Sequence, residues 1–188
     1  PARERVQMGI GRVPEDRHAE GVVGEFAVWE NAVLEQLTTS DFSSAGCVRQ
    51  GAGQRHAERL IESYDIRGAG PKTRTRLLSG GNMQKLILGR VLASNPRFIL
   101  ANQPTRGLDE GAIAAVHTHL LSARENGAAI LLITEELEEA TALADRVQAM
   151  VKGRLSQAIA TDETDARTLG LMMAGHWDAA KGISHDAA

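Results

Sequence analysis

Two short stretches carry glycine and polar residues of the kinds found at binding sites. In the first, "LLSGGNMQK" (residues 77–85), Ser79, Gly80 and Gly81 stand at the start of an apolar helical pattern. Unpaired N–H groups and the positive dipole end of a helix N-terminus attract anions, and glycine lets a phosphate approach closely. Each glycine should destabilise a helix by roughly 1 kcal/mol relative to alanine, so folding alone does not explain them. We therefore expect an anionic ligand at this turn.

The second stretch, "QPTRGLD" (residues 103–109), follows a short apolar run. Taken alone, "SGG" reads equally well as a flexible loop before a helix. Asp109 alone reads as an ordinary helix cap. A cap at Asp109 would not exclude a further role in binding.

Hydrophobic periodicity predicts the elements that must position these residues. Helices are expected at residues 28–37, 54–64, 82–94, 111–126 and 136–144, and strands at residues 6–13, 97–102 and 128–134. Two further strands, "RVQAMV" and "RLSQAIA", flank a Lys152-Gly153 turn, and a last helix with "LGLMMAG" precedes a frayed tail. This order predicts an α/β sheet core beside a helical subdomain.

Composition narrows the functional classes. The chain has 188 residues, is 43% hydrophobic and carries a formal net charge of −3. Its charges are interspersed, which argues against a nucleic-acid partner. Cys47 is the single cysteine, which excludes a disulfide within these residues and fits a reducing compartment. No apolar run approaches the ~20 residues of a membrane-spanning helix.

At these motifs the sequence resembles the ATP-binding cassette (ABC) ATPases. The likeness rests on "LLSGGNMQK" as the signature, "RFILANQPTRGLD" as Walker B and D-loop, and "AILLITEELEEATALADRV" as the switch region. "GRVPEDR" and "LMMAG" make it similar to the second cassette of simple-sugar and nucleoside importers. The resemblance implies a partial RecA-like α/β core with a helical signature subdomain. Its expected parts are the core strand and Q-loop region (1–25), the helical signature subdomain (26–95), the RecA-like part with Walker B, D-loop and switch region (96–160), and the C-terminal helix and tail (161–188).

The resemblance also implies site residues. Those expected to bind ATP held by a partner cassette are Ser79, Gly80, Gly81, Asn82, Gln84 and, at the dimer interface, Asp109. Gln103 and Glu135 stand at the catalytic Walker B and switch positions, and Asn102 stands at the metal-binding Walker B position.

The sequence departs from the family pattern at the site that would serve its own ATP. No G-x-x-x-x-G-K-[ST] motif occurs, so the chain alone is not expected to hold ATP, and we expect its start to lie inside a longer chain. The amides of Asn102 and Gln103 supply neither the charge that holds Mg²⁺ nor a base for water. Glu135 replaces the switch histidine and would repel a phosphate. An engineered Glu-to-Gln change explains Gln103 alone, so we interpret the three changes as native.

The Q-loop glutamine is replaced as well, by "PEDR" (residues 14–17). Arg17 could form a structural ion pair with Asp16 or act near a nucleotide, and the sequence leaves both open. Elements that act on the chain's own ATP are altered, whereas those that act on a partner's ATP are intact. An asymmetric pair of cassettes is therefore expected.

These observations predict the C-terminal part of the second nucleotide-binding domain of an importer ATPase. ATP and Mg²⁺ are expected in the full assembly, and the isolated piece is expected to be inactive. The expected partners are the first nucleotide-binding domain and transmembrane permease subunits, at the cytoplasmic face of the membrane. The alternative is a stand-alone pseudo-ATPase module that binds a true cassette. A DNA-repair cassette is a weaker option, because sustained heptads are missing.

Overall fold

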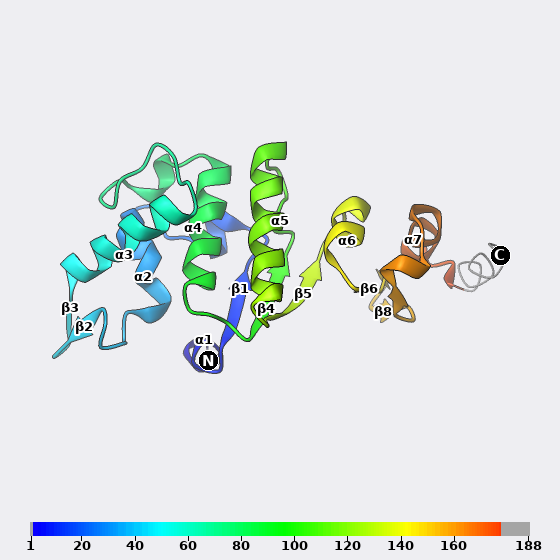
Figure 1. Ribbon diagram of the computed structural model, residues 1–188, viewed down its shortest axis with the longest axis horizontal. Coiled ribbons are helices and arrows are strands. Elements are labelled where there is room, and N and C mark those ends of the chain that lie inside the picture. The colour runs from blue at the N-terminus through cyan, green and yellow to red at the C-terminus, as the bar shows by residue number, and fades with distance from the viewer. Residues whose placement is uncertain (1, 178–188) are drawn as a thin grey trace. The chain divides into compact units, whose positions relative to one another are not determined.

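The computed structural model describes residues 2–177 of the chain. It divides into two compact units, residues 1–133 and 134–188 (Figure 1). The expected frayed tail falls largely on residues 178–188, which lie outside the described residues. The four-part division at residues 25, 95 and 160 stays a prediction.

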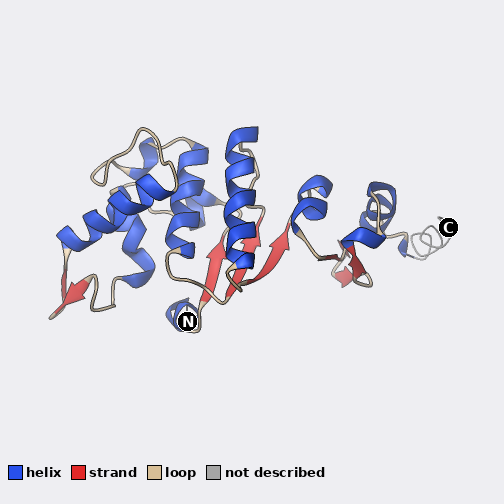
Figure 2. Ribbon diagram, in the orientation of Figure 1, coloured by secondary structure: helices blue, strands red, loops and turns tan. Residues whose placement is uncertain are grey.

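A parallel three-stranded sheet forms the base of the first unit, with strand order β1-β4-β5. The strands are β1 (Ile10–Val13), β4 (Phe98–Asn102) and β5 (Ala129–Ile133), drawn in red in Figure 2. The central strand β4 has Ile99 and Ala101 fully buried, and its last residue, Asn102, pairs with Ile133. Parallel strands bring their carboxyl ends to one edge of the sheet, so residues that follow β1 and β4 are close to each other.

Helices α4 (Gly80–Leu92) and α5 (Glu110–Glu125) pack on each other, α4 against β1 and α5 against β5. Helix α4 also contacts α2 (Val28–Val33) and α3 (Gln50–Ser63), so it joins the sheet to the helical part of the unit. Its buried apolar side chains are Met83, Leu86, Ile87, Leu88 and Val91. Such a helix, apolar around most of its circumference, is typical of a core position.

Short elements complete the first unit. They are α1 (Ala2–Gln7), the π-helical turn η1 (Arg17–Gly21), the 3₁₀ turns η2 (Leu34–Gln36) and η3 (Thr75–Leu77), and the hairpin strands β2 (Ser43–Ser44) and β3 (Cys47–Val48).

The second unit has its own small core. Its elements are α6 (Leu137–Leu143), β6 (Arg146–Val147), β7 (Met150–Val151), β8 (Arg154–Leu155), β9 (Ile159–Ala160), η4 (Thr161–Glu163) and α7 (Ala166–Met173). Val147 and Ala149 are buried with Leu169 and Met172 of α7. The turn between β7 and β8 has positive φ at both central residues, Lys152 (48°) and Gly153 (76°), as a tight hairpin turn requires.

The expected helices and strands are confirmed for the most part, with shifts of a few residues at their ends. The strand expected at residues 6–13 is wrong in its first part, because residues 2–7 form α1. Gly9, with φ of 78°, donates its N–H to the carbonyl of Val6 and ends that helix, so β1 starts only at Ile10. The helix expected at residues 28–37 ends at Val33 and continues as η2.

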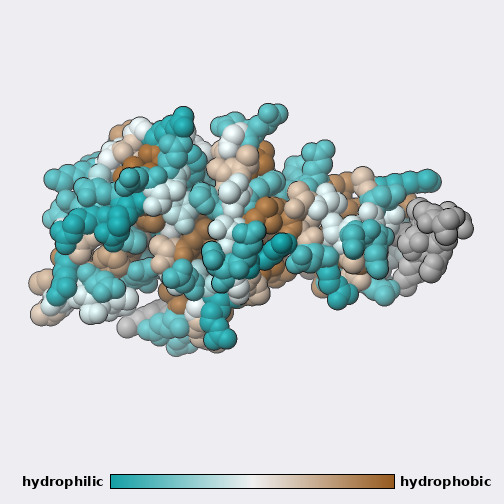
Figure 3. Space-filling view, in the orientation of Figure 1, coloured by the Kyte–Doolittle hydropathy of each residue, from teal (hydrophilic) through white to brown (hydrophobic). Residues whose placement is uncertain are grey.

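Hydrophilic side chains cover much of the face shown in Figure 3, including most of α3, with smaller apolar patches between them. In the described part of the chain, no helix combines the length and the hydropathy needed to cross a bilayer.

Candidate functional site

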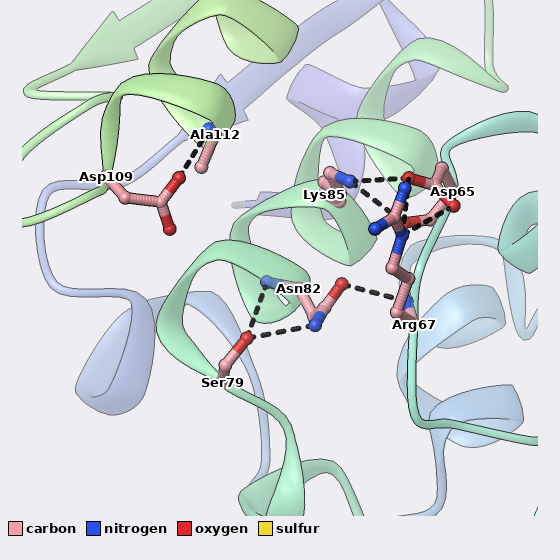
Figure 4. Close-up of polar contacts among 7 residues, drawn as sticks. All are labelled: Asp65, Arg67, Ser79, Asn82, Lys85, Asp109 and Ala112. Carbon is pink, nitrogen blue, oxygen red and sulfur yellow. Dashed lines mark hydrogen bonds and ion pairs between the residues drawn. The ribbon is translucent and has the colours of Figure 1, made fainter.

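Helix α4 begins directly after Ser79, whose side chain caps it. Ser79 Oγ accepts hydrogen bonds from the backbone N–H of Asn82 (3.4 Å) and from Asn82 Nδ2 (2.9 Å), as Figure 4 shows. Both bonds use the hydroxyl oxygen as acceptor, so the exposed hydroxyl can still donate its proton to an acceptor outside the chain. The expected helix start at this turn is confirmed.

Asn82 is held from two sides. Its Oδ1 accepts a hydrogen bond from the backbone N–H of Arg67 at 2.9 Å, while its Nδ2 donates to Ser79. Lys85, one turn further along α4, donates to the carbonyl of Asp65 at 2.8 Å. The Arg67 side chain pairs with Asp65 and holds the pKa of that carboxyl below its usual value, with a smaller effect from Lys85. Because the Asn82 amide is fixed by the N–H of Arg67, its hydrogen bond to Ser79 orients the Ser79 hydroxyl.

Both glycines of this turn are approached by other parts of the chain. A Cβ on Gly81 would lie 3.2 Å from the Cβ of Ala112 in α5, and a Cβ on Gly80 would lie 3.1 Å from Nη2 of Arg17. The structure thus corrects the sequence argument, in which folding alone gave no reason for these glycines. Close packing is therefore one reason for glycine at both positions, whether or not a phosphate also approaches them.

The turn also offers a set of hydrogen-bond donors. Gly80 and Gly81 are the first residues of α4, so their N–H groups have no acceptor within the helix. The Ser79 hydroxyl and the Arg17 guanidinium lie beside them. Backbone donors at a helix N-terminus and a guanidinium suit phosphate oxygens, so an anion fits this turn.

Gln84 does not belong to this donor set. Its side chain is 2% exposed, and its Nε2 donates to the carbonyl of Pro104 at 2.7 Å. The burial leaves the amide no access to a ligand, so the expected phosphate contact is corrected to a packing role. Gln84 ties α4 to the loop that follows β4.

Asp109 caps α5. Its Oδ1 accepts a hydrogen bond from the backbone N–H of Ala112 at 2.9 Å (Figure 4), and the residue is exposed. The expected cap is confirmed. Because Ala112 also approaches Gly81, the first turns of α4 and α5 are adjacent. Ser79, Gly80, Gly81 and Asp109 therefore share one part of the surface of the first unit, called the donor surface below.

Asn102 and Gln103 lie at the carboxyl end of β4 and are half-buried. Gln103 has φ of 48°, and its N–H donates to the carbonyl of Ile133 at 2.8 Å. A positive φ is uncommon for a residue other than glycine and is often found at functional sites. The side chains, however, are amides, and Mg²⁺ prefers carboxylates and water. Within residues 2–177, no group of three or more His, Cys, Asp or Glu side chains could hold a metal ion.

The sequence of this chain is similar to those of import ATP-binding proteins. No family model matches the chain. The guanosine import ATP-binding protein NupO of Bacillus subtilis is 42% identical over 173 residues, which cover 92% of this chain and 34% of the relative. The nucleoside import ATP-binding protein NupA of Lactococcus lactis is 38% identical, with the same coverage of 92% and 34%. The ribose import ATP-binding protein RbsA of Bacillus subtilis is 33% identical, covering 92% of this chain and 35% of the relative.

Solved structures agree on the fold. A dimeric post-hydrolysis state of an ATP-binding cassette bound to ADP and Pi has a TM-score of 0.67 at 21% identity, covering 84% of this chain and 66% of that chain. The ADP conformation of a cassette from an ABC transporter has a TM-score of 0.64 at 18% identity, covering 96% and 70%. The chain belongs to the ATP-binding cassette family. The predicted α/β cassette fold is thereby confirmed, and the chain spans about a third of the length of the curated relatives it matches.

In this cassette Glu135 follows β5 and belongs to the second unit. It is exposed, and the adjacent Thr134 accepts a hydrogen bond from the N–H of Glu136 at 3.0 Å, which starts the turn into α6. A role for Glu135 at the end of the sheet beside Gln103 stays a prediction.

From the sequence, Arg17 could either pair with Asp16 or lie near a nucleotide. Among the described residues no ion pair joins it to Asp16, which instead caps η1 by accepting from the N–H groups of His18 and Ala19 at 2.9 Å each. These backbone hydrogen bonds lower the pKa of Asp16. Arg17 points away to another loop, where its Nη1 donates to the carbonyl of Arg106 at 2.8 Å.

Sequence reasoning missed Arg90, which lies in α4 and is 5% exposed. Its Nη2 donates to the carbonyl of Gly21 at 2.8 Å, and its Nε pairs with Glu35 at 3.2 Å. Burial lowers the pKa of Arg90, and the Glu35 carboxylate opposes that shift. A single arginine inside an otherwise apolar run was the available signal, because such a residue must find partners in the core.

Proposed function

We propose that this cassette is part of the ATP-hydrolysing subunit of an importer for nucleosides or simple sugars. The support is that relatives named for guanosine, nucleoside and ribose import each match 92% of the chain. Because the chain spans about a third of their length, we propose that it acts within a longer protein as the second of two cassettes. The first cassette and the transmembrane permease subunits are its partners, at the cytoplasmic face of the membrane.

The chain serves an ATP site that is built mainly by the partner cassette. The donor surface carries this proposal: Ser79, Gly80, Gly81 and Asp109 are gathered on it, while the positions at the end of β4 hold amides. The cassette closes on its partner over ATP with Mg²⁺ and relays this closure to the permease. The Ser79 hydroxyl and the N–H groups of Gly80 and Gly81 bind the terminal phosphate, and Asp109 lies at the dimer interface.

The chain's own nucleotide position does no hydrolysis. Gln103 cannot accept a proton as a carboxylate does, and Asn102 adds no charge for a cation. Within the described residues, β5 pairs only with β4, and Leu131 and Ile133 on β5 are 50% and 47% exposed. We propose that a further strand of the longer protein pairs with this edge and that other segments of that protein cover these side chains, which project from one face of the sheet.

An uptake assay tests the importer function. The gene is deleted in its source organism, and cells are compared with and without the restored gene for uptake of labelled guanosine, adenosine, ribose and glucose. Deletion should abolish uptake of at least one solute, and restoration should return it. Unchanged uptake of a full panel of nucleosides and simple sugars would contradict the proposal.

A further inference from the structure

Residues 14–17, which follow β1, contact Arg106 in the loop that follows β4. Arg17 Nη1 donates to the main-chain carbonyl of Arg106, 89 positions further on, at 2.8 Å. The Glu15 carboxylate pairs with the side chain of the same Arg106. Residues 14–17 therefore hold both the main chain and the side chain of Arg106, which lies between Gln103 and the D-loop Asp109.

The Arg17 guanidinium also lies against the signature turn (Ser79, Gly80 and Gly81). The point where a Cβ on Gly80 would sit is 3.1 Å from Arg17 Nη2, 3.3 Å from Nε and 3.4 Å from Cζ. Three nearly equal distances indicate that the guanidinium plane faces Gly80. The same Nη2 is 3.6 Å from the Cβ point of Gly107. One side chain thus fills the space between the signature turn and the loop that leads to Asp109.

Arg17 is itself held in place at both ends of η1. At the start, Asp16 accepts two backbone hydrogen bonds at 2.9 Å. At the end, Arg90 of α4 donates to the carbonyl of Gly21 at 2.8 Å, and a Cβ on the buried Gly21 would lie 2.5 Å from Ile87 Cδ1. Any shift of η1 relative to α4 would break these contacts, so the position of Arg17 is coupled to that of the signature helix.

The positive charge of Arg17 lies beside the N-terminus of α4. A guanidinium beside the positive end of a helix dipole is unfavourable by itself. Arg17 Nε is buried and has no hydrogen-bond partner among the described residues. An anion bound at the signature turn would be attracted by both positive groups, so the arrangement is most stable when the turn is occupied.

We propose that Arg17 is a positioning residue that holds the signature turn and the D-loop as one surface facing the partner's ATP. The proposal rests on the proposed function and names a further residue for it. Residues 14–17, which take the place of the Q-loop, thereby serve the partner's site instead of the chain's own.

The test uses the full-length protein, assembled with its permease in proteoliposomes. Arg17→Met should lower kcat for ATP hydrolysis on the order of tenfold or more, because small displacements of positioning groups have large effects on rate. KM for ATP should change by less than about twofold, because the partner cassette holds the nucleotide. Arg17→Lys should recover part of kcat, since an ammonium group can still donate to the Arg106 carbonyl. Arg55→Met, which removes an exposed arginine of α3, is the matched control and should leave both constants unchanged.

A second variant tests the contact with Gly80 directly. Gly80→Ala should lower kcat strongly in the unchanged protein and much less when combined with Arg17→Met, because the added methyl then meets no guanidinium. If Arg17→Met fails to assemble, Gly80→Ala is compared alone and with Arg17→Lys, and equal losses in the two backgrounds overturn the proposal.

Ser79→Arg separates this inference from the proposed function. If Ser79→Arg abolishes hydrolysis while Arg17→Met keeps kcat within about twofold, the role of Arg17 is overturned and the proposed function stands. If Ser79→Arg has no effect, the proposed function itself fails. A rise in KM for ATP together with a fall in kcat for Arg17→Met would also overturn the positioning role, because it would indicate that Arg17 binds ATP directly.

Discussion

Gly81 of the signature turn and Ala112 of α5 are in direct contact, since a Cβ on Gly81 would lie only 3.2 Å from the Ala112 Cβ. The N–H of the same Ala112 bonds to the Asp109 carboxylate at 2.9 Å. One small residue thus joins the signature turn to the cap of the D-loop helix. The two motifs are therefore one surface, and their spacing is set by how closely α4 and α5 approach.

This contact predicts a coupling between the two residues. In Gly81→Ala the added methyl should cost about 1–3 kcal/mol by overpacking, while helix propensity returns roughly 1 kcal/mol. Adding Ala112→Gly should relieve the overpacking, with a coupling of about 0.5–3 kcal/mol in a double-mutant cycle. Urea unfolding of the four proteins measures it. Strictly additive effects would show that the two helices adjust freely.

Gln84 should be needed for stability. Gln84→Leu keeps the side chain's size but leaves the buried carbonyl of Pro104 without its donor, which should cost about 1–3 kcal/mol. Gln50→Leu, at the exposed start of α3, is the control and should change the free energy of unfolding by less than about 0.5 kcal/mol. Chemical denaturation of both variants gives the comparison. Equal losses would mean that the bond to Pro104 adds nothing.

Stability should fall on mild acidification because of two half-buried histidines. Burial lowers the pKa of His119 and of His56 below the ordinary 6.5, with smaller effects from Lys85 and Arg59. The unfolded chain then takes up protons at a higher pH than the folded one. Stability is therefore full above pH 6.5 and is lost as the pH falls through the folded values.

Melting temperatures at pH 8 and pH 5.5 test this pH dependence. The ring centroid of His119 lies 4.5 Å from that of Tyr64. His119 is replaced by glutamine, alone and together with His56→Gln. The drop between the two pH values should shrink in His119→Gln and shrink further in the double variant. A drop of unchanged size in the double variant would place the titrating groups elsewhere.

Much of the fold was predictable because it rests on local pattern. The buried strand β4 and the inward positions Val116 and Leu120 of α5 follow from side-chain periodicity, whereas Ala112 is buried in place of the expected Ile113. The caps Ser79 and Asp109 were predictable as well, since they bond to residues three positions along the chain.

What the sequence missed depends on contacts between distant residues. Gln84 looks like a polar ligand until Pro104, 20 positions away, takes its amide. Arg17 reaches Arg106 across 89 positions, and no local pattern contains that information. The glycines at 80 and 81 were attributed to a ligand because Arg17 and Ala112 could not be placed against them. Polar residues with distant partners are where sequence reasoning fails, because burial and pairing are set by the tertiary fold.

The central claim is that this cassette serves a partner's ATP and not its own. The most direct measurement is ATP hydrolysis by the full-length protein with its permease, comparing Ser79→Arg with Gln103→Ala. We predict that Ser79→Arg abolishes transport-coupled hydrolysis, because a bulky cation fills the donor surface, and that Gln103→Ala changes the rate little. If Gln103→Ala is as damaging as Ser79→Arg, the chain's own site takes part in hydrolysis and the asymmetric account is wrong.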